Sequence, residues 1–215
     1  WRSLWLTLDA SALEPGRAAI ELELVDSAGE QLAAFSLTVS VLNQALPPQT
    51  LFQTQWFHAD CLADYYQVPV FSEEHWRILD NFMASAAEHG INMLLTPIFT
   101  PPLDTAKGGE RTTVQLVDIT LKDGEWSFQF DRLRRWVKMA RSHGITEIEL
   151  AHLFTQWGAE FAPKIFVYTS NGLEKRFGWH TPAVGGEYTC FLRAFLPALK
   201  QEMDELVGLA HVWFH

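Results

Sequence analysis

Apolar residues recur at every second position along much of the first fifty residues. Leucines do so over 4–8, isoleucine and leucines over 20–24, and a longer apolar series over 32–42. This period is typical of half-buried β-strands. The turn-forming stretch Asp26-Ser27-Ala28-Gly29 predicts that the second and third of these segments pair as antiparallel strands. Such a small sheet cannot close a sandwich by itself, and Pro47-Pro48 then indicates a short linker.

After the linker, apolar strand-like runs alternate with stretches of helical period. The predicted order is strand 54–59, helix 73–89, strand 91–96, a helix capped by Asp131, strand 145–153, helix 187–207 and strand 209–215. Ser72 is a suitable N-cap for the first helix, and Pro197 is expected to bend the last. Alternation of this kind predicts an α/β fold with a parallel sheet. The first half of a (β/α)8 TIM-type barrel is the leading architecture, and a doubly wound open sheet is the alternative.

The predicted loops are short at one end of the sheet and long at the other. Glu88-His89-Gly90-Ile91 and Ser142-His143-Gly144-Ile145 each turn from helix to strand within one glycine cap. The strand-to-helix loops, by contrast, are expected to span 60–71, 97–130 and 154–186. The middle loop is predicted to hold a hairpin of 114–117 and 126–128 around Asp123-Gly124. Barrel enzymes build their sites from loops that follow strands, so these loops are the expected place of function.

A complete barrel needs eight strands in roughly 250 residues, whereas residues 49–215 predict four. We therefore expect 49–215 to be the N-terminal half of a catalytic barrel that is truncated at its C-terminus. The open edge of such a half-barrel is expected to favour self-association. The chain also begins without Met and without a signal peptide, so we expect a truncated N-terminus. A cytoplasmic location is slightly favoured over a secreted one.

Composition narrows the class of ligand. The chain of 215 residues has a formal net charge of −10, which argues against nucleic acid as a partner because phosphates require a basic face. No apolar run is long enough to span a membrane. Cys61 and Cys190 give neither a disulfide framework nor a zinc spacing and are interpreted as two buried thiols. The unusual feature is the aromatic content, with 9 Trp and 15 Phe.

Polar side chains occur where the predicted strands end. Trp56, His58 and Asp60 share one side of the first strand, while His152 and His215 end the third and fourth. His58, His152 and His215 are thus expected to lie close together at the carboxyl ends of neighbouring strands. Three interpretations remain open: core histidines with satisfied hydrogen bonds, metal ligands together with Asp60, or hydrogen-bonding groups for a polar substrate.

Flat indole faces beside polar side chains suit a sugar ring, which has apolar C–H faces and hydroxyl edges. Trp157 and Trp179 lie in the third long loop, where they are expected to form a wall of such a site. Glycoside hydrolysis also needs two carboxyl groups near the scissile bond. No convincing pair is found: Glu73-Glu74 cap a helix, and Glu147 and Glu149 share one side at the start of a strand, the wrong end for catalysis.

Four stretches resemble glycoside hydrolase family 123 and its uncharacterised relatives. They are residues 52–60 (FQTQWFHAD), 95–105 (LTPIFTPPLDT), 152–158 (HLFTQWG) and 177–180 (FGWH). The resemblance covers about 51–215, and it implies that 1–48 are the C-terminal strands of a β-sandwich domain that precedes the barrel.

The resemblance implies an exo-acting, retaining β-N-acetylgalactosaminidase in which the 2-acetamido oxygen of the substrate attacks the anomeric carbon. An Asp orients that group and the adjacent Glu is the general acid and base. The pair is expected just after His215, so the fragment itself is expected to be inactive. The expected ligand is an N-acetylgalactosaminide, with no cofactor and no metal. The expected substrate-binding residues are Trp56, His58, Asp60, Thr96, His152, Gln156, Trp157, Trp179, His180 and His215. Alternatives are a non-catalytic carbohydrate-binding module and a metal-dependent hydrolase that uses the strand-end histidines.

Overall fold

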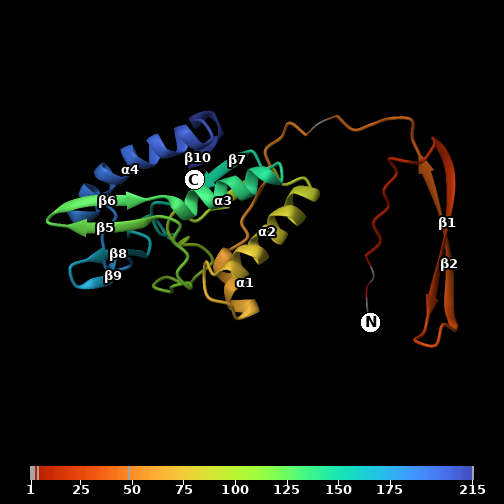
Figure 1. The fold of residues 1–215 in the computed structure, drawn as a ribbon, viewed down its shortest axis with the longest axis horizontal. Helices are drawn as coiled ribbons and strands as arrows, with labels where there is room; N and C mark the ends of the chain where they lie inside the picture. The colour runs from red at the N-terminus through yellow and green to blue at the C-terminus, as the bar shows by residue number, and fades with distance from the viewer. Residues whose placement is uncertain (1–2, 4, 48, 215) are drawn as a thin grey trace. The chain divides into compact units, whose positions relative to one another are not determined.

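The computed structural model describes residues 3, 5–47 and 49–214, which form two compact units, Trp1–Gln49 and Thr50–His215. The first unit contains the predicted hairpin: β1 (Gly16–Val25) pairs antiparallel with β2 (Gln31–Val41), as Figure 1 shows. The predicted strand at 4–8 does not form over 5–8, where the side chains are exposed and no strand pairs with them in the described part of the unit. Leu4 lies outside the described residues.

The second unit is built on a four-stranded sheet in the order β10-β7-β4-β3. Its strands are β3 (Thr54–Gln55), β4 (Met93–Thr96), β7 (Glu147–Leu150) and β10 (Val212–Phe214), and every neighbouring pair is parallel. The helices α2 (Glu73–Glu88), α3 (Asp131–Ser142) and α4 (Gly186–Leu206) lie between successive strands in the chain. The predicted α/β class with a parallel sheet is therefore confirmed.

Local chemistry explains where these helices begin and end. The Ser72 hydroxyl accepts a hydrogen bond from the His75 amide at 3.2 Å, which is the predicted cap of α2. Gly90 and Gly144 follow α2 and α3 with φ of 82° and 87°, a left-handed conformation that glycine adopts without strain. Pro197 lies inside α4, and the expected bend at this residue stays a prediction.

The long loops form a second sheet, in the order β6-β5-β8-β9. Its strands are β5 (Asp118–Lys122), β6 (Glu125–Gln129), β8 (Ile165–Thr169) and β9 (Gly172–Phe177). The turn at Asp123-Gly124 is confirmed, but its first strand begins at Asp118 rather than Val114. Residues 114–117 are instead buried, and the Gln115 side chain exchanges hydrogen bonds with the Phe166 backbone.

A short helix, α1 (Ala59–Tyr66), replaces the end of the predicted first strand. Its buried residues Ala59, Leu62 and Ala63 follow a helical spacing, which is the sequence signal that the strand interpretation overlooked. As a result, β3 contains only Thr54–Gln55, and the remaining predicted strand residues leave the sheet.

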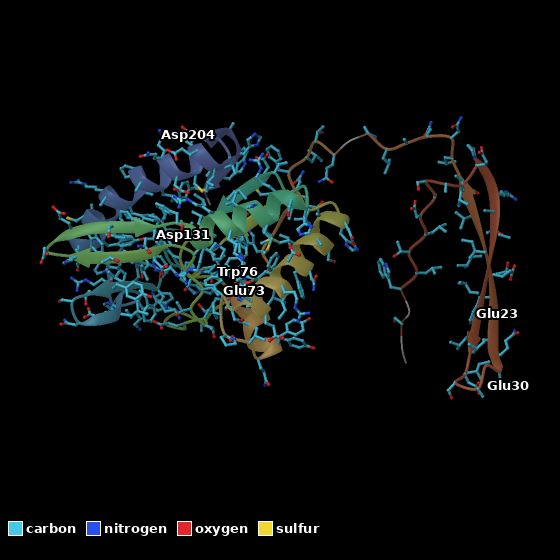
Figure 2. The ribbon with its side chains drawn as sticks, in the orientation of Figure 1. Glu23, Glu30, Glu73, Trp76, Asp131 and Asp204 are labelled. Atoms are coloured by element: carbon cyan, nitrogen blue, oxygen red, sulfur yellow. The ribbon has the colours of Figure 1, made fainter. Side chains whose placement is uncertain are left out.

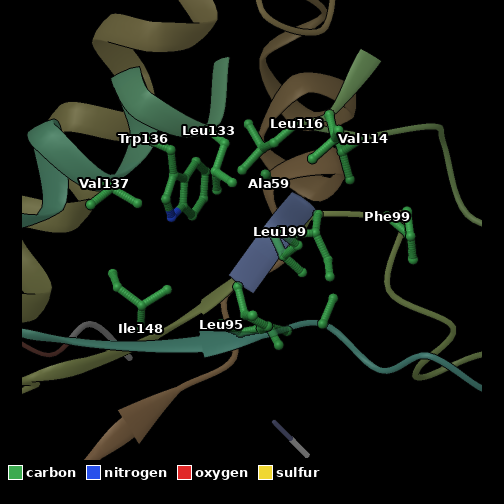
Figure 3. Close-up of a cluster of buried hydrophobic side chains, with 14 of the residues drawn as sticks. Ala59, Leu95, Phe99, Val114, Leu116, Leu133, Trp136, Val137, Ile148 and Leu199 are labelled. Carbon is green, nitrogen blue, oxygen red and sulfur yellow. The ribbon is translucent and has the colours of Figure 1, made fainter. Parts of the chain in front are cut away.

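Buried side chains from helices and sheet form one continuous core in this unit. Figure 3 shows Trp136 and Val137 of α3 pointing toward Ile148 of β7. A second aromatic group joins α4 to the β5–β6 hairpin, where the Phe191 and Phe195 rings stack at 5.4 Å. Both cysteines are exposed free thiols, so the prediction that they are buried is wrong. Among the described residues, no helix has the length and apolarity to cross a membrane.

Candidate functional site

Trp56 and His152 meet where β3 and β7 end. Trp56 follows β3 directly, and its indole lies edge-on to the His152 ring, with the ring centroids 5.5 Å apart. His152 lies two residues after β7. The two side chains are partly buried, and they occupy the carboxyl ends of parallel strands, where ligands of such sheets usually bind.

A turn from the loop after β4 joins two further predicted site residues. The His58 Nε2 atom lies 2.6 Å from Asp104 Oδ2, and the Trp157 Nε1–H donates to the Thr105 carbonyl at 3.3 Å. Asp104 and Thr105 are adjacent, so His58 and Trp157 contact neighbouring residues of one short segment. We call Trp56, His58, His152 and Trp157 the strand-end cluster.

Trp157 is the accessible member of this cluster. Its side chain is 61% exposed, and its backbone has a φ of +67°, which is strained for a bulky residue. Strain of this kind concentrates at functional sites, where the surrounding structure holds the residue in place. An exposed indole in a fixed orientation is a suitable platform for the apolar face of a ligand.

Three other predicted site residues lie in the long loop 154–186, which also carries Trp157. None of them has a contact with the strand-end cluster among the described interactions. The Trp179 indole donates to the Gly109 carbonyl at 2.8 Å and packs on Phe161. The Gln156 Oε1 atom is buried and has no hydrogen-bond partner among the described residues. His180 is exposed, and its ring bonds to the Arg176 carbonyl at 3.3 Å. His215 lies outside the described residues.

Asp60 lies in a helix instead of the predicted strand, whereas Thr96 ends β4 as predicted but is fully buried. Asp60 is in the first turn of α1, where its Oδ2 accepts from Arg111 Nε at 2.8 Å in a buried ion pair. Thr96 is fully buried, and its hydroxyl accepts from the Trp136 indole at 3.1 Å. The missed helix α1 turns Asp60 toward Arg111, and the Thr96 hydroxyl bonds to a side chain of α3. A substrate contact by either residue stays a prediction.

Two buried glutamates on β7 support the site, and the sequence analysis set them aside. Glu149 Oε2 accepts hydrogen bonds from the Trp56 indole at 2.9 Å and from the Thr54 hydroxyl at 2.5 Å. Glu147 accepts from the Trp213 indole at 2.8 Å and bonds to His211 at 2.7 Å. Both side chains lie on the face of β7 opposite Ile148, since side chains alternate along a strand. Glu149 therefore holds the indole of Trp56, which follows β3, and Glu147 holds the indole of Trp213 in β10.

The two Glu147 hydrogen bonds predict a dependence of stability on pH. Burial by itself raises the pKa of Glu147, but the bonds from Trp213 and His211 together lower that pKa below its ordinary value of 4.5. The ionised carboxylate therefore stabilises the fold above pH 4.5, and this contribution is lost as the pH falls through the lowered pKa. In urea unfolding between neutral pH and about pH 3, Glu147→Gln should lose less stability on acidification than the unchanged protein. Equal losses would contradict the assignment.

The metal interpretation gains no geometric support from the described residues, in which no three His, Cys, Asp or Glu side chains gather as ligands. His58 instead pairs with Asp104, and His152 packs on Trp56.

Comparison with known proteins identifies the family. Residues 56–215, well over half of the chain, match the model of the glycoside hydrolase 123 catalytic domain. A search of curated proteins found no match. The matched range begins at Trp56 and includes the whole strand-end cluster together with both buried glutamates. The chain therefore belongs to glycoside hydrolase family 123.

Proposed function

We propose that the strand-end cluster binds the terminal sugar of a β-N-acetylgalactosaminide, and that the full enzyme hydrolyses it from the non-reducing end with retention. Two observations carry this proposal. Trp56 contacts His152 at the ends of β3 and β7, and His58 and Trp157 contact the adjacent residues Asp104 and Thr105. The chain itself links the two groups, since His58 lies two residues after Trp56 and Trp157 lies five residues after His152. An exposed indole supplies a stacking surface, and the imidazoles supply hydrogen bonds to hydroxyl or acetamido groups.

The chemistry that we propose uses the substrate as its own nucleophile. The 2-acetamido oxygen forms a bond to the anomeric carbon while the glycosidic bond breaks, and a general acid protonates the departing oxygen. The resulting cyclic oxazolinium is then opened by water, which the same residue deprotonates. An Asp beside that acid would orient the acetamido group.

Glu147 and Glu149 are unsuited to these roles. Both carboxylates are buried, and each accepts hydrogen bonds from two side chains. These bonds engage the carboxylates inside the protein rather than with a substrate. We therefore propose that the Asp-Glu pair belongs to a longer polypeptide, after His215, and that residues 1–215 alone are catalytically inactive.

A comparison of two protein lengths tests the activity. A polypeptide extended past His215 to include an Asp-Glu pair should release nitrophenol from an aryl β-N-acetylgalactosaminide, whereas residues 1–215 should stay at the uncatalysed rate. Turnover by residues 1–215 would contradict the placement of the acid. An extended, folded protein that releases nothing from any N-acetylhexosaminide would contradict the activity.

A substrate comparison tests the role of the acetamido group. The matching aryl β-galactoside has a hydroxyl at carbon 2 and lacks the internal nucleophile, so its kcat/KM should be lower by on the order of a thousandfold or more. Similar kcat/KM values for the two substrates would exclude substrate assistance while leaving a glycosidase.

A non-catalytic sugar-binding function is the second candidate, favoured by the exposure of Trp157. Calorimetry with N-acetylgalactosamine distinguishes it: binding by the extended protein without turnover of any glycoside would support this alternative.

A further inference from the structure

A cavity lies apart from the strand-end cluster. It has a volume of about 240 Å³ and is formed where the connection between α1 and α2, the start of α3 and the β8–β9 hairpin meet. No member of the strand-end cluster lines it. Its charged groups are Asp118 and Arg132, Thr113 and Gln115 are uncharged polar residues of its lining, and its aromatic groups include Phe71 and Tyr168.

A paired guanidinium and carboxylate form the polar side of this cavity. Arg132 bonds to Asp118 Oδ1 through Nη2, and both side chains remain about one third exposed. The guanidinium lies over the Phe71 ring at 5.1 Å from its centroid, and Arg132 Nε is buried with no hydrogen-bond partner among the described residues. The pair thus keeps both donor and acceptor capacity next to an aromatic face.

The aromatic wall is held in a strained conformation. Phe71 has a φ of +58°, and its amide donates to His75 Nδ1 at 2.9 Å. His75 is fully buried, and its Nε2–H donates to the Ala59 carbonyl at 2.9 Å. The imidazole therefore links the backbone at Phe71, before α2, to the first residue of α1. Phe71 also stacks on Trp76, which Figure 2 labels beside Glu73 on α2. Strain that is held this firmly is typical of binding sites.

The opposite rim consists of exposed apolar side chains. Tyr168 on β8 and Leu173 on β9 are directly paired across the hairpin, so both point to the same side, and both line the cavity. They are 46% and 54% exposed. The cavity therefore has a ring and an aliphatic chain on one side and the Arg132–Asp118 pair on the other.

The charge balance decides the class of ligand. Asp118 neutralises Arg132, and the chain as a whole carries −10, so an anion gains little here. Vicinal hydroxyls can instead accept from the guanidinium and donate to the carboxylate while C–H groups rest on Tyr168 or Phe71. The volume is below the roughly 300–1,000 Å³ of pockets for drug-sized ligands, which suits one ring rather than a chain.

We propose that this cavity is a separate binding site for a single neutral hexopyranose residue. The inference does not depend on the activity proposed for the strand-end cluster.

Amide chemical shifts of the 215-residue chain test the proposal. Methyl β-D-galactoside and methyl β-D-glucoside serve as neutral probes, titrated to about 50 mM, where a site with a millimolar Kd is filled. We expect at least one probe to shift the amides of Thr113, Tyr168 and Leu173. Galacturonate, which adds a carboxylate to the same ring, should bind no more tightly than the neutral galactoside.

Variants establish where the probe binds. Tyr168→Ala should weaken the interaction by about tenfold, whereas Tyr66→Ala, which removes an equally exposed tyrosine outside the cavity, should leave it unchanged. Asp118→Asn keeps the side-chain shape and should also weaken binding, which covers the case in which Tyr168→Ala does not fold. The proposal is overturned if neither probe shifts these amides, if only galacturonate does, or if both pocket variants bind as tightly as the unchanged protein.

Discussion

Asp60→Ala is expected to destabilise the second unit by about 3–5 kcal/mol, because removal of one partner leaves an uncompensated buried charge. The remaining charge is Arg111, which comes from the loop after β4 and is nearly as buried as Asp60. Arg111 also bonds to the Leu103 carbonyl and to Cys61 Sγ, so its displacement should loosen the loop that carries Asp104 and Thr105. Urea unfolding at neutral pH measures the loss.

Asp64 provides the matched control on the same helix. It accepts a hydrogen bond from Thr112, the residue next to Arg111, but this contact is exposed to solvent. Asp64→Ala is therefore expected to reduce stability by less than about 1 kcal/mol. If the two alanine variants unfold at the same urea concentration, burial of the Asp60–Arg111 pair does not carry the stability assigned to it.

Glu149→Ala is expected to reduce stability by about 1–3 kcal/mol, since it leaves the partly buried Trp56 indole without its acceptor, whereas the exposed Thr54 hydroxyl can bond to water. The variant should also weaken binding of N-acetylgalactosamine, because the Trp56 ring loses the bond that fixes it against His152. Urea unfolding and calorimetry measure the two effects separately.

Two further variants separate the hydrogen bonds from a general effect of charge. Glu149→Gln keeps an acceptor oxygen and most of the volume and should lose less stability than Glu149→Ala. Glu125→Ala removes an exposed carboxylate from β6 and should change stability by less than about 0.5 kcal/mol. An unchanged sugar affinity in a folded Glu149→Ala protein would show that Glu149 does not position Trp56.

Local patterns predicted the regular elements of the second unit well. Ser72, Gly90 and Gly144 act through neighbouring backbone groups, so their effects are visible within a few residues of sequence. The alternation of apolar runs with helices likewise predicted the parallel sheet β10-β7-β4-β3.

The elements that were missed had weaker or competing signals. Trp56, His58 and Asp60 fit a strand period, while the helical spacing of Ala59 and Leu62 in α1 indicated the correct structure. The β8–β9 hairpin was overlooked, and its two-residue loop is Ser170-Asn171, with Gly172 already paired to Thr169 at the start of β9.

The site was predicted only in part because its contacts join residues far apart in sequence. His58 pairs with Asp104, 46 residues away, and Glu149 bonds to Trp56, 93 residues away. The types of residue at strand ends indicated a polar, aromatic site. Which of them are accessible depends on long-range pairing, as the burial of Asp60 against Arg111 shows.

A crystal structure of the protein with bound N-acetylgalactosamine tests the central claim most directly. We expect the sugar ring against the exposed Trp157 indole, with its acetamido and hydroxyl groups within hydrogen-bond distance of His58 or His152. A sugar bound elsewhere on the second unit, with the surface between Trp56 and Trp157 empty, would contradict it.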